Sequence, residues 1–525
     1  MNIATILHDR TAAHPQFPAI IDTHCHHSRI ITFADLELAA SRACTLLRRC
    51  GLQPGDAVLV FYPMSAELYT ALLALFRLGL VAMFLDPGAG RNHIEQCCAL
   101  YPPKAFIASP KAHLLRLVSP ALRRIPLKFA IAFPVPGAIS WHSARHLPPD
   151  PEIVPCNHDT PALLTFTSGS TGQPKAALRT HGFLLSQNRV LAQTLQPKPG
   201  EVELVTLPIF VLANLAAGMT SVIPKGDLRF PGAIAPSPII AQIQTHKPSR
   251  ILASPAFLER LAEYCLERRL TLPSIEEIFS GGAPVMPLAI AKWQQIAPQA
   301  EFTVVYGSTE AEPIARICDR DIRSQDVAAT LKGRGLLVGK PVFAIQVKIL
   351  RQQWGKPITS YTNTEFAAAC LPPEIAGQIV VSGNHVLPSY LYGHGNEETK
   401  FSVENIPWHR TGDAGYLDLQ GRLWLLGRCS ACIEDEYGIL YPFAVEAVVQ
   451  DHPGIRRAAI VSYRGKRTLV VELNNRQSKI NLTSLQQSMT NAHIQVIKIF
   501  NKIPVDKRHN SKIDYPALHK LLQLH

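Results

Sequence analysis

A short stretch rich in hydroxyl, glycine and lysine residues begins where an apolar run ends. The apolar run is Ala162–Phe166, which is typical of a buried strand. The polar stretch that follows is Thr167-Ser168-Gly169-Ser170-Thr171-Gly172-Gln173-Pro174-Lys175. Hydroxyls and backbone amides donate hydrogen bonds, glycines let the backbone approach a ligand closely, and the lysine adds a positive charge. The stretch therefore predicts a loop that holds a polyphosphate.

A Ser/Gly surface linker is the alternative, but a linker needs neither a buried strand before it nor a lysine at its end. A P-loop of the GxxxxGK[ST] type is excluded, because Lys175 follows Pro174 and no Ser or Thr comes after it. The stretch resembles the signature loop of the adenylate-forming superfamily of acyl-CoA synthetases, peptide-synthetase adenylation domains and luciferases. The resemblance implies that Thr167 and Lys175 are catalytic and that Thr167 is also a metal ligand. It implies nucleotide binding by the remaining residues, Ser168, Gly169, Ser170, Thr171 and Gly172.

Two further segments match the superfamily's nucleotide-binding motifs, each after a predicted strand. In Ser280-Gly281-Gly282-Ala283-Pro284, the resemblance implies a wall against adenine made by Gly282, Ala283 and Pro284, with an ordinary glycine turn as the alternative. In Tyr306-Gly307-Ser308-Thr309-Glu310, it implies that Tyr306 stacks on adenine, Thr309 reaches the α-phosphate and Glu310 holds Mg²⁺, with Gly307 and Ser308 as part of the same nucleotide site. A carboxylate suits Mg²⁺, which prefers hard oxygen ligands. Glu312 is a competing ligand that spacing alone does not exclude.

The last matching segments lie toward the carboxyl end. In the segment from Arg410 to Arg428, the resemblance gives Asp413 the ribose hydroxyls and Arg428 a contact with ribose or phosphate. It gives Ser430 the role of a hinge, although many relatives have Asp or Lys there. Lys512, near the end of the segment Pro504–Ile513, matches the catalytic lysine that bridges the substrate carboxylate and the α-phosphate. A basic tail that binds acidic partners is the alternative, since Lys507, Arg508 and Lys520 are nearby.

Short apolar runs alternate with longer stretches of helical spacing along most of the chain. The alternation predicts an α/β fold whose parallel sheets are covered by helices on both faces. Ligands in such sheets bind at the carboxyl ends of strands, which is where the loop after Phe166 falls. We expect strands at Val58–Tyr62, Val81–Leu85, Val202–Leu207, Ile251–Ala253, Glu277–Ser280 and Phe302–Tyr306, and helices at Leu36–Leu47, Ala66–Leu78 and Ala256–Arg268.

The pattern shifts toward β after residue 340, with Ala344–Leu350 and Gly377–Ser382 as strands of a small barrel or sandwich. A helix at Tyr441–Gln450 and short strands after it predict a separate α+β domain. Together with the resemblance, this gives an N-terminal AMP-binding domain at residues 1–429, made of two sheet-and-helix subdomains plus the small β-barrel. Residues 430–525 are expected to form a mobile C-terminal cap domain that carries Lys512.

Composition sets the class of protein and its partners. With 47% hydrophobic and 18% charged residues the chain is globular, and its net charge of +12 favours anionic partners such as nucleotides, phosphopantetheine or a membrane surface touched peripherally. The cation-and-aromatic pattern of nucleic-acid binding is missing. With no signal-peptide pattern and no apolar run suited to a membrane span, we expect a cytoplasmic protein. His24-Cys25-His26-His27 fits a hairpin loop better than a metal site, and the Cys429/Cys432 pair is left unassigned.

The expected reaction is that of an AMP-forming ligase. A substrate carboxylate attacks the α-phosphate of ATP in the presence of Mg²⁺, giving an acyl-adenylate and pyrophosphate. Four segments are Ser254–Leu261, Tyr306–Pro313, Leu440–Pro442 with Glu446, and Pro504–Lys512. They look closest to the branch with the olefin-pathway β-lactone synthetases, where the 3-hydroxyl of a fatty acid closes the ring. Fatty acyl-CoA ligases, which use CoA, are the alternative in the same branch, and a catalytically silent scaffold or acyl-carrier-protein partner is a second. The apolar stretch Pro208–Leu215 predicts an acyl pocket with Phe210, Asn214 and Gly218.

Overall fold

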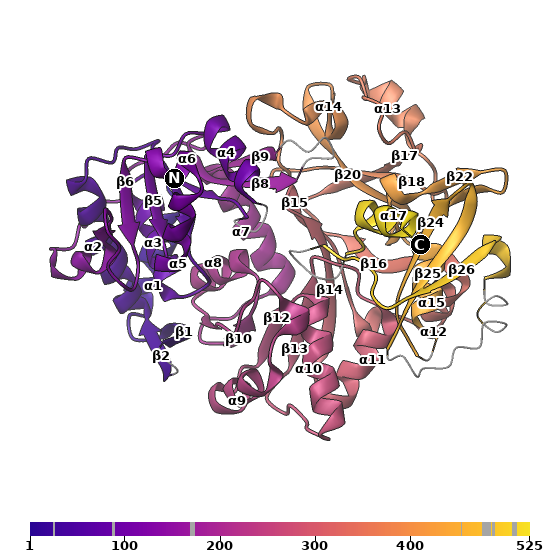
Figure 1. Cartoon of the computed structure of the whole chain (residues 1–525), viewed down its shortest axis with the longest axis horizontal. Helices are drawn as coiled ribbons and strands as arrows, with labels where there is room; N and C mark the ends of the chain where they lie inside the picture. The colour runs from indigo at the N-terminus through magenta and orange to yellow at the C-terminus, as the bar shows by residue number, and fades with distance from the viewer. Residues whose placement is uncertain are drawn as a thin grey trace. The chain divides into compact units, whose positions relative to one another are not determined.

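The computed structural model describes residues 1–24, 27–86, 90–168, 174–452, 454–474, 485, 489–506 and 512–524. Contacts divide the chain into two compact units, Met1–Lys225 with Leu387–Glu397, and Gly226–Val386 with Glu398–His525 (Figure 1). The boundary expected at residues 429 and 430 does not coincide with this division and stays a prediction.

A seven-stranded sheet organises the first unit. Its order is β7-β6-β5-β3-β4-β8-β9, and all neighbouring pairs are parallel except β8 with β9. Helices occupy the connections because the apolar residues recur at helical spacing there, and a capping box between Thr32 and Asp35 starts the first of them. The strands are β3 (Ala57–Phe61), β4 (Val81–Phe84), β5 (Ala105–Ala108), β6 (Leu127–Ala130), β7 (Ile139–Ser140), β8 (Pro161–Ser168) and β9 (Pro174–Thr180), and the helices are α2 (Phe33–Arg49), α3 (Ala66–Arg77), α4 (Arg91–Leu100), α5 (Pro110–His113) and α6 (Pro120–Arg124).

A second group of strands in the first unit runs in the order β10-β11-β1-β2. Strands β1 (Pro18–His24) and β2 (His27–Thr32) pair antiparallel with His24 opposite His27, which confirms the hairpin expected at this histidine-rich stretch. Residues 25 and 26 lie outside the described part of the chain. Around these strands are β10 (Val202–Val205), β11 (Thr220–Val222), α1 (Ala4–Ala13), α7 (His181–Leu195) and α8 (Pro208–Ala217).

The second unit begins with three parallel strands, β12, β13 and β14. The last residues of β13 and β14 begin the two predicted motifs, so the carboxyl ends of these strands carry the Ser280 and Tyr306 segments. Strand β15 then turns back antiparallel to β14. These elements are α9 (Pro236–His246), β12 (Arg250–Ala253), α10 (Pro255–Glu267), β13 (Glu277–Gly281), α11 (Pro287–Ile296), β14 (Glu301–Ser308) and β15 (Ala311–Cys318).

Antiparallel strands in the order β17-β18-β20-β21-β16 follow, with β19 paired to β20. The expected strands Ala344–Leu350 and Gly377–Ser382 are found here as β17 (Gln346–Leu350) and β18 (Gly377–Ser382). The remaining elements are α12 (Ser324–Ala329), β16 (Leu336–Pro341), α13 (Asn363–Ala369), α14 (Asn396–Thr399), β19 (Lys400–Val403), β20 (Ile406–Leu417) and β21 (Leu423–Arg428).

The carboxyl-terminal part forms a small sheet, β24-β25-β26, flanked by helices. The helix expected at Tyr441–Gln450 is α15 (Phe443–Gln450), and its buried residues pack with those of the sheet. The other elements are β22 (Ile433–Asp435), β23 (Gly438–Leu440), β24 (Ile455–Tyr463), β25 (Lys466–Leu473), β26 (Val496–Phe500) and α17 (Tyr515–Gln523). No helix in the described ranges is both long and apolar enough to span a bilayer.

Candidate nucleotide-binding site

Three residues predicted from separate motifs meet in the second unit. Tyr306 lies near the end of β14, Asp413 lies in β20, and Arg428 ends β21, where it stands opposite Asp413 in the strand pairing. The hydroxyl of Tyr306 donates a hydrogen bond to Oδ2 of Asp413 at 2.8 Å, and Nη1 of Arg428 lies 3.1 Å from Oδ1. We call these three residues the ribose cluster, after the ligand group predicted for Asp413.

Burial and charge keep the proton on two members of the ribose cluster, Arg428 and Tyr306. The carboxylate of Asp413 raises the pKa of Arg428. Burial, and then the charge of Asp413, holds the pKa of Tyr306 well above its ordinary value, so its hydroxyl stays a donor. A carboxylate offers about four lone-pair sites, and the two protein contacts leave Asp413 capacity for further hydroxyl donors. Because the Arg428 side chain is 43% exposed, its guanidinium remains accessible to an anion.

The backbone beside the ribose cluster depends on two glycines. Gly412 has a φ of +77°, and a Cβ there would lie 3.1 Å from the Trp354 ring. A Cβ at Gly307 would lie 3.1 Å from the carbonyl oxygen of Ala311, because β14 and β15 turn tightly at this point. The amide of Glu310 donates to Oγ of Ser308 at 3.3 Å within that turn. These contacts explain why glycine occupies positions 307 and 412.

Glu310, the predicted Mg²⁺ ligand, is partly exposed and lies in a neighbourhood of cations. Its charge raises the pKa of Arg428 and opposes the lowering of the Lys400 pKa. A carboxylate oxygen of this kind fits a hard cation that also carries phosphate. Glu312 is half-buried in the same hairpin, so the choice between the two carboxylates stays a prediction.

Lys400 is a residue of this neighbourhood that sequence reasoning missed. It begins β19 opposite His409 and is only 9% exposed. Burial lowers the pKa of its ammonium to about 7. The local pattern Lys400-Phe401-Ser402-Val403 alternates polar and apolar residues, which predicts an outward lysine, so the sequence held no signal for its burial.

The segment after β13, residues 282–284, has the backbone features expected of a wall against adenine. Gly281 pairs with Val305, so a Cβ there would collide with the backbone of β14, and Gly282 has a φ of +79°. Oγ of Ser280 is buried without a hydrogen-bond partner among the described residues. Gly282, Ala283 and Pro284 are half-buried rather than covered. Their contact with adenine stays a prediction.

The signature loop in the first unit connects the antiparallel strands β8 and β9, and residues 169–173 lie outside the described part of the chain. Thr167 and Ser168 belong to β8, and Thr167 pairs in register with Lys175 in β9. Lys175 is buried, with its Nζ 5.9 Å from the centre of the Tyr390 ring. A Cβ at Gly395 would lie 2.6 Å from the Lys175 side chain. The segment around Tyr390 and Gly395 thus shapes the surroundings of this lysine, which sequence reasoning did not foresee.

The residues predicted for the acyl pocket lie on and after α8. Phe210 is buried, and Asn214 donates to Glu203 at 2.8 Å and to Ser221 at 3.1 Å. Gly218 ends the helix with a φ of +78°. A different side of α8, with Leu212 and Ala213, lines an apolar cavity of about 50 Å³. Such a volume holds one or two water molecules, well below the size of a ligand pocket. The acyl pocket therefore stays a prediction.

Lys512 and Ser430 lie in the carboxyl-terminal part. The amide of Lys512 donates to Oδ1 of Asp506 at 3.0 Å, and the amide of Asp506 donates to the carbonyl of Lys512 at 2.8 Å. This reciprocal pair fixes the backbone of Lys512, while residues 507–511 lie outside the described ranges. Ser430 is exposed in the short turn Cys429–Ala431 that follows β21. The roles of both residues stay predictions.

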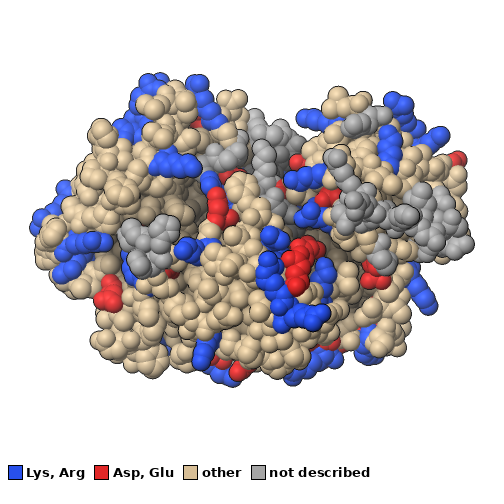
Figure 2. Space-filling view, turned by 60° about the horizontal axis from the view of Figure 1, so that its bottom comes forward, with Lys and Arg blue, Asp and Glu red and all other residues tan. Residues whose placement is uncertain are grey.

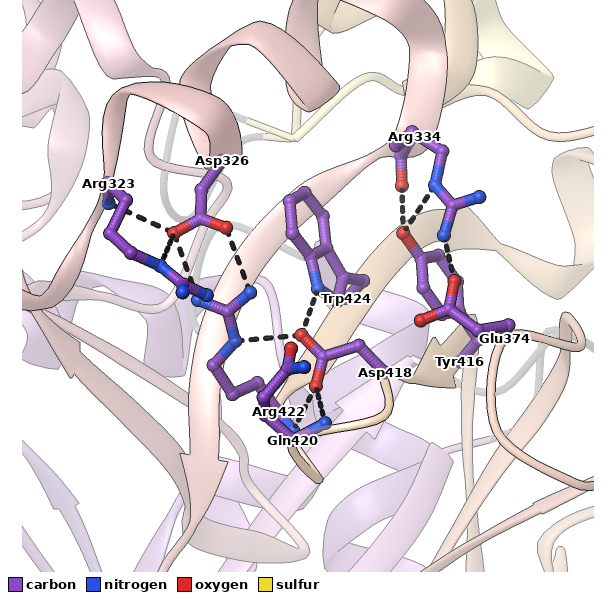
Figure 3. A network of polar contacts seen from close by, with 9 residues as sticks. All are labelled: Arg323, Asp326, Arg334, Glu374, Tyr416, Asp418, Gln420, Arg422 and Trp424. Atoms are coloured by element: carbon purple, nitrogen blue, oxygen red, sulfur yellow. Dashed lines mark hydrogen bonds and ion pairs between the residues drawn. The ribbon is translucent and has the colours of Figure 1, made fainter.

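A polar network anchors the β20–β21 hairpin that carries Asp413 and Arg428 (Figure 3). Asp418 accepts from the indole of Trp424 at 3.1 Å and from Nε of Arg422 at 2.7 Å. Arg422 also makes a two-pronged contact with Asp326 of α12, at 2.8 and 2.9 Å. Burial alone would raise the pKa of Asp418, but the Trp424 and Arg422 hydrogen bonds lower it below its ordinary value. The hairpin is therefore held from both its turn and a neighbouring helix.

The chain is similar to known proteins along most of its length. The family described as AMP-binding enzyme matches residues 7–391. The olefin beta-lactone synthetase of Stenotrophomonas maltophilia (strain K279a) is 31% identical over 92% of this chain and 89% of its own. A feruloyl-CoA synthase of an Amycolatopsis species is 26% identical over 83% of this chain and 81% of its own. The solved structure of the anthranilate CoA ligase AuaEII with anthranoyl-AMP shares the fold, with a TM-score of 0.84 at 17% identity, covering 100% of this chain and 98% of that one.

Proposed function

This chain belongs to the AMP-binding enzyme family, and from that premise we propose that it activates a fatty 3-hydroxy acid and closes it to a β-lactone. It is an adenylate-forming enzyme, as are its relatives. The observation that carries the proposal is that Tyr306 and Arg428 both contact the carboxylate of Asp413, although the three residues come from motifs far apart in the chain. The similarity to the olefin beta-lactone synthetase over 92% of the chain favours the lactone as product.

The first half-reaction makes a mixed anhydride. A carboxylate oxygen of the acid bonds to the α-phosphorus of ATP, the bond from that phosphorus to the bridging oxygen breaks, and pyrophosphate leaves. No side-chain nucleophile takes part, so catalysis depends on position and on stabilising negative charge. Asp413 would orient the ribose, and Lys512 would neutralise charge at the α-phosphate.

Glu310 and Thr167 are the residues that would hold Mg²⁺, a carboxylate and a hydroxyl being the hard oxygen donors that this cation takes. Bound there, the cation would neutralise phosphate charge. Within the described residues the site offers Glu310 as a partly exposed carboxylate among cations, which fits an ion shared with a phosphate.

In the second half-reaction the 3-hydroxyl oxygen attacks the activated acyl carbon of the same molecule. The acyl carbon to AMP oxygen bond breaks, AMP leaves, and the hydroxyl proton passes to solvent. This step needs neither CoA nor an acyl-carrier protein. As part of the proposal the enzyme works in the cytoplasm.

A fatty acyl-CoA ligase is the second candidate, favoured by the similarity to the feruloyl-CoA synthase. In that case a CoA thiol replaces the intramolecular hydroxyl as the attacking group. The adenylation half-reaction is the same for both candidates, so only the product separates them.

The test supplies ATP and Mg²⁺ with matched fatty acids that differ only in the 3-hydroxyl, with and without CoA, and identifies products by mass spectrometry. A β-lactone formed from the 3-hydroxy acid without CoA is the expected result. A thioester that requires CoA, formed equally from both acids, would replace the lactone proposal with the ligase. Absence of pyrophosphate release with every acid would leave only the silent scaffold or carrier-protein partner.

A further inference from the structure

One corner of the first unit exposes large apolar side chains. Three of them lie within five residues of each other, on the short 3₁₀ turn Leu114–Leu117 and just after it. Leu114 is 61% exposed, Leu117 75% and Val118 54%. Single exposed apolar residues are ordinary on a protein surface, but a local group of them marks an interaction site.

The connection between β6 and β7 extends this group. Phe133, in that connection, is 72% exposed. Nη1 of Arg116 donates to the carbonyl of Pro136 at 3.2 Å, so the 3₁₀ turn and the connection lie side by side. We call residues 111–124 and 133–139 the amphiphilic corner.

The charge of the amphiphilic corner is mostly positive, with Glu95 of α4 accepting from Oγ of Ser119 and from the amide of Ala121 at its inner side. Residues 96–149 contain seven Lys and Arg residues and no Asp or Glu. Lys111, Arg123 and Arg124 are exposed, and none of the three forms an ion pair with a residue that the structure describes. On the face in Figure 2, basic side chains are spread widely and acidic ones are confined to a few spots. The corner thus joins three exposed cations that form no ion pair among the described residues to exposed aliphatic groups.

The corner lies away from the predicted phosphate loop within the first unit. Strand β7 is at one edge of the seven-stranded sheet, and the β8–β9 hairpin that carries the loop is at the other edge. A partner bound at the corner would leave that hairpin uncovered, so binding and adenylation can be measured separately.

We propose that the amphiphilic corner docks this enzyme on the surface of a lipid bilayer that contains anionic phospholipids. Leu114, Leu117, Val118 and Phe133 enter the region between headgroups and acyl chains, while Lys111, Arg123 and Arg124 contact lipid phosphates. A nucleic acid would use the cations but gains little from aliphatic side chains, and it favours several stacking aromatics where the corner has Phe133 alone. Charge complementarity and the exposed aliphatic side chains together favour an anionic bilayer over a nucleic acid as the partner.

The test is sedimentation of the full chain with vesicles, at low and at raised salt. One set of vesicles is phosphatidylcholine with about one-third phosphatidylglycerol, and the other is phosphatidylcholine alone. The charge variant is Arg123→Gln with Arg124→Gln, and the apolar variant is Leu117→Ser with Phe133→Ser. The matched control is Arg268→Gln with Arg269→Gln, an exposed arginine pair in the second unit.

The unaltered chain is expected to bind the anionic vesicles and to release them as salt rises. Loss of two cations weakens binding about 30-fold, and loss of the two apolar side chains weakens it about tenfold or more. The control pair binds like the unaltered chain, and pyrophosphate exchange without vesicles is the same for all four proteins. Absence of binding by the unaltered chain, equal binding by the charge variant, or retention on single-stranded RNA in preference to anionic vesicles would each overturn the proposal.

Discussion

Asp413 is oriented by the protein from two sides. Tyr306 donates to one carboxylate oxygen and Arg428 lies beside the other, so the carboxylate is held in place before a ligand arrives. A group held in this way loses little freedom on binding, which increases the affinity it contributes. We therefore expect Asp413 to act mainly on ATP affinity.

Replacing Asp413→Asn keeps the shape of the side chain and removes its charge. Hydrogen bonds to charged groups contribute about 1.5–3 kcal/mol, so the KM for ATP in pyrophosphate exchange should rise about 10- to 100-fold. Tyr306→Phe is the milder control, because it removes one orienting hydrogen bond and keeps the ring. An unchanged KM in a folded Asp413→Asn protein would remove this residue from nucleotide recognition.

Glu446 is a carboxyl group that no step of the proposed chemistry uses, yet it is almost completely buried. It accepts from the Tyr515 hydroxyl at 2.6 Å and from the amide of Ile460 at 3.1 Å. Burial raises its pKa to about 7. The contact ties α15 to the start of α17, three residues beyond Lys512.

The raised pKa of Glu446 predicts a dependence of stability on pH. The folded state holds this proton more tightly than the unfolded state, so the stabilisation is complete below about pH 4.5 and is lost as pH rises through about 7. Glu446→Gln stays neutral and does not lose this stabilisation. The difference in free energy of unfolding, variant minus unaltered protein, should therefore rise by roughly 3 kcal/mol as pH increases from about 4.5 to above about 7. Urea unfolding at pH 5 and pH 8 measures the difference. A difference that stays constant across this range would contradict the prediction.

At the scale of elements, the polar network that stabilises the β20–β21 hairpin also holds the two strands that carry residues of the ribose cluster. Arg422 is 12% exposed and joins Asp418 of the hairpin to Asp326 of α12 (Figure 3). Hydrogen bonds from Arg422 lower the pKa of Asp326. Asp413 and Arg428 lie on the two strands that this network holds together.

Removing Arg422 should therefore cost much more than removing a surface partner of the same carboxylate. Arg422→Ala leaves the buried carboxylate of Asp418 without its cation and that of Asp326 with only the exposed Arg323, and we expect a loss of about 3–5 kcal/mol in the free energy of unfolding. Arg323, which also contacts Asp326, is 52% exposed, so Arg323→Ala should cost about 1 kcal/mol or less. Denaturant unfolding of both variants tests this, and equal losses would show that the buried network is not what holds the hairpin.

Sequence reasoning succeeded where the signal was local. The strand expected at Val58–Tyr62 is β3 (Ala57–Phe61), and the helix expected at Ala66–Leu78 is α3 (Ala66–Arg77), since the spacing of apolar residues is a property of neighbouring positions. The same holds for β8 and for the α/β class of the fold. Tyr306, Asp413 and Arg428 were each singled out by their motifs, and the structure brings them together.

What could not be foreseen depends on pairs of residues far apart in the chain. Arg422 meets Asp326 across 96 residues, and the Tyr390 ring reaches Lys175 only through the fold. Lys400 looks like a surface residue in its strand and is buried by tertiary packing. No spacing rule relates such partners, because their distance is decided by how sheets and helices are layered.

At the scale of the whole molecule, the residues proposed for adenylation are divided between the two compact units. The predicted phosphate loop belongs to the first, while the ribose cluster, Glu310 and Lys512 belong to the second. The carboxyl-terminal part fixes the Lys512 backbone through Asp506 and anchors the following helix through Glu446. We expect that lysine to act through its charge, with the rest of its segment serving to present it.

The most direct test of adenylation by this chain is carboxylate-dependent exchange of pyrophosphate into ATP by Lys512→Ala, compared with Lys520→Ala. Lys520 is an exposed lysine of α17, so it reports on general positive charge at this end of the chain. We predict that the exchange rate falls by about two to three orders of magnitude in Lys512→Ala, as for loss of one electrostatic group at a transition state, and is unchanged in Lys520→Ala. Exchange at the unaltered rate in a folded Lys512→Ala protein would contradict the account.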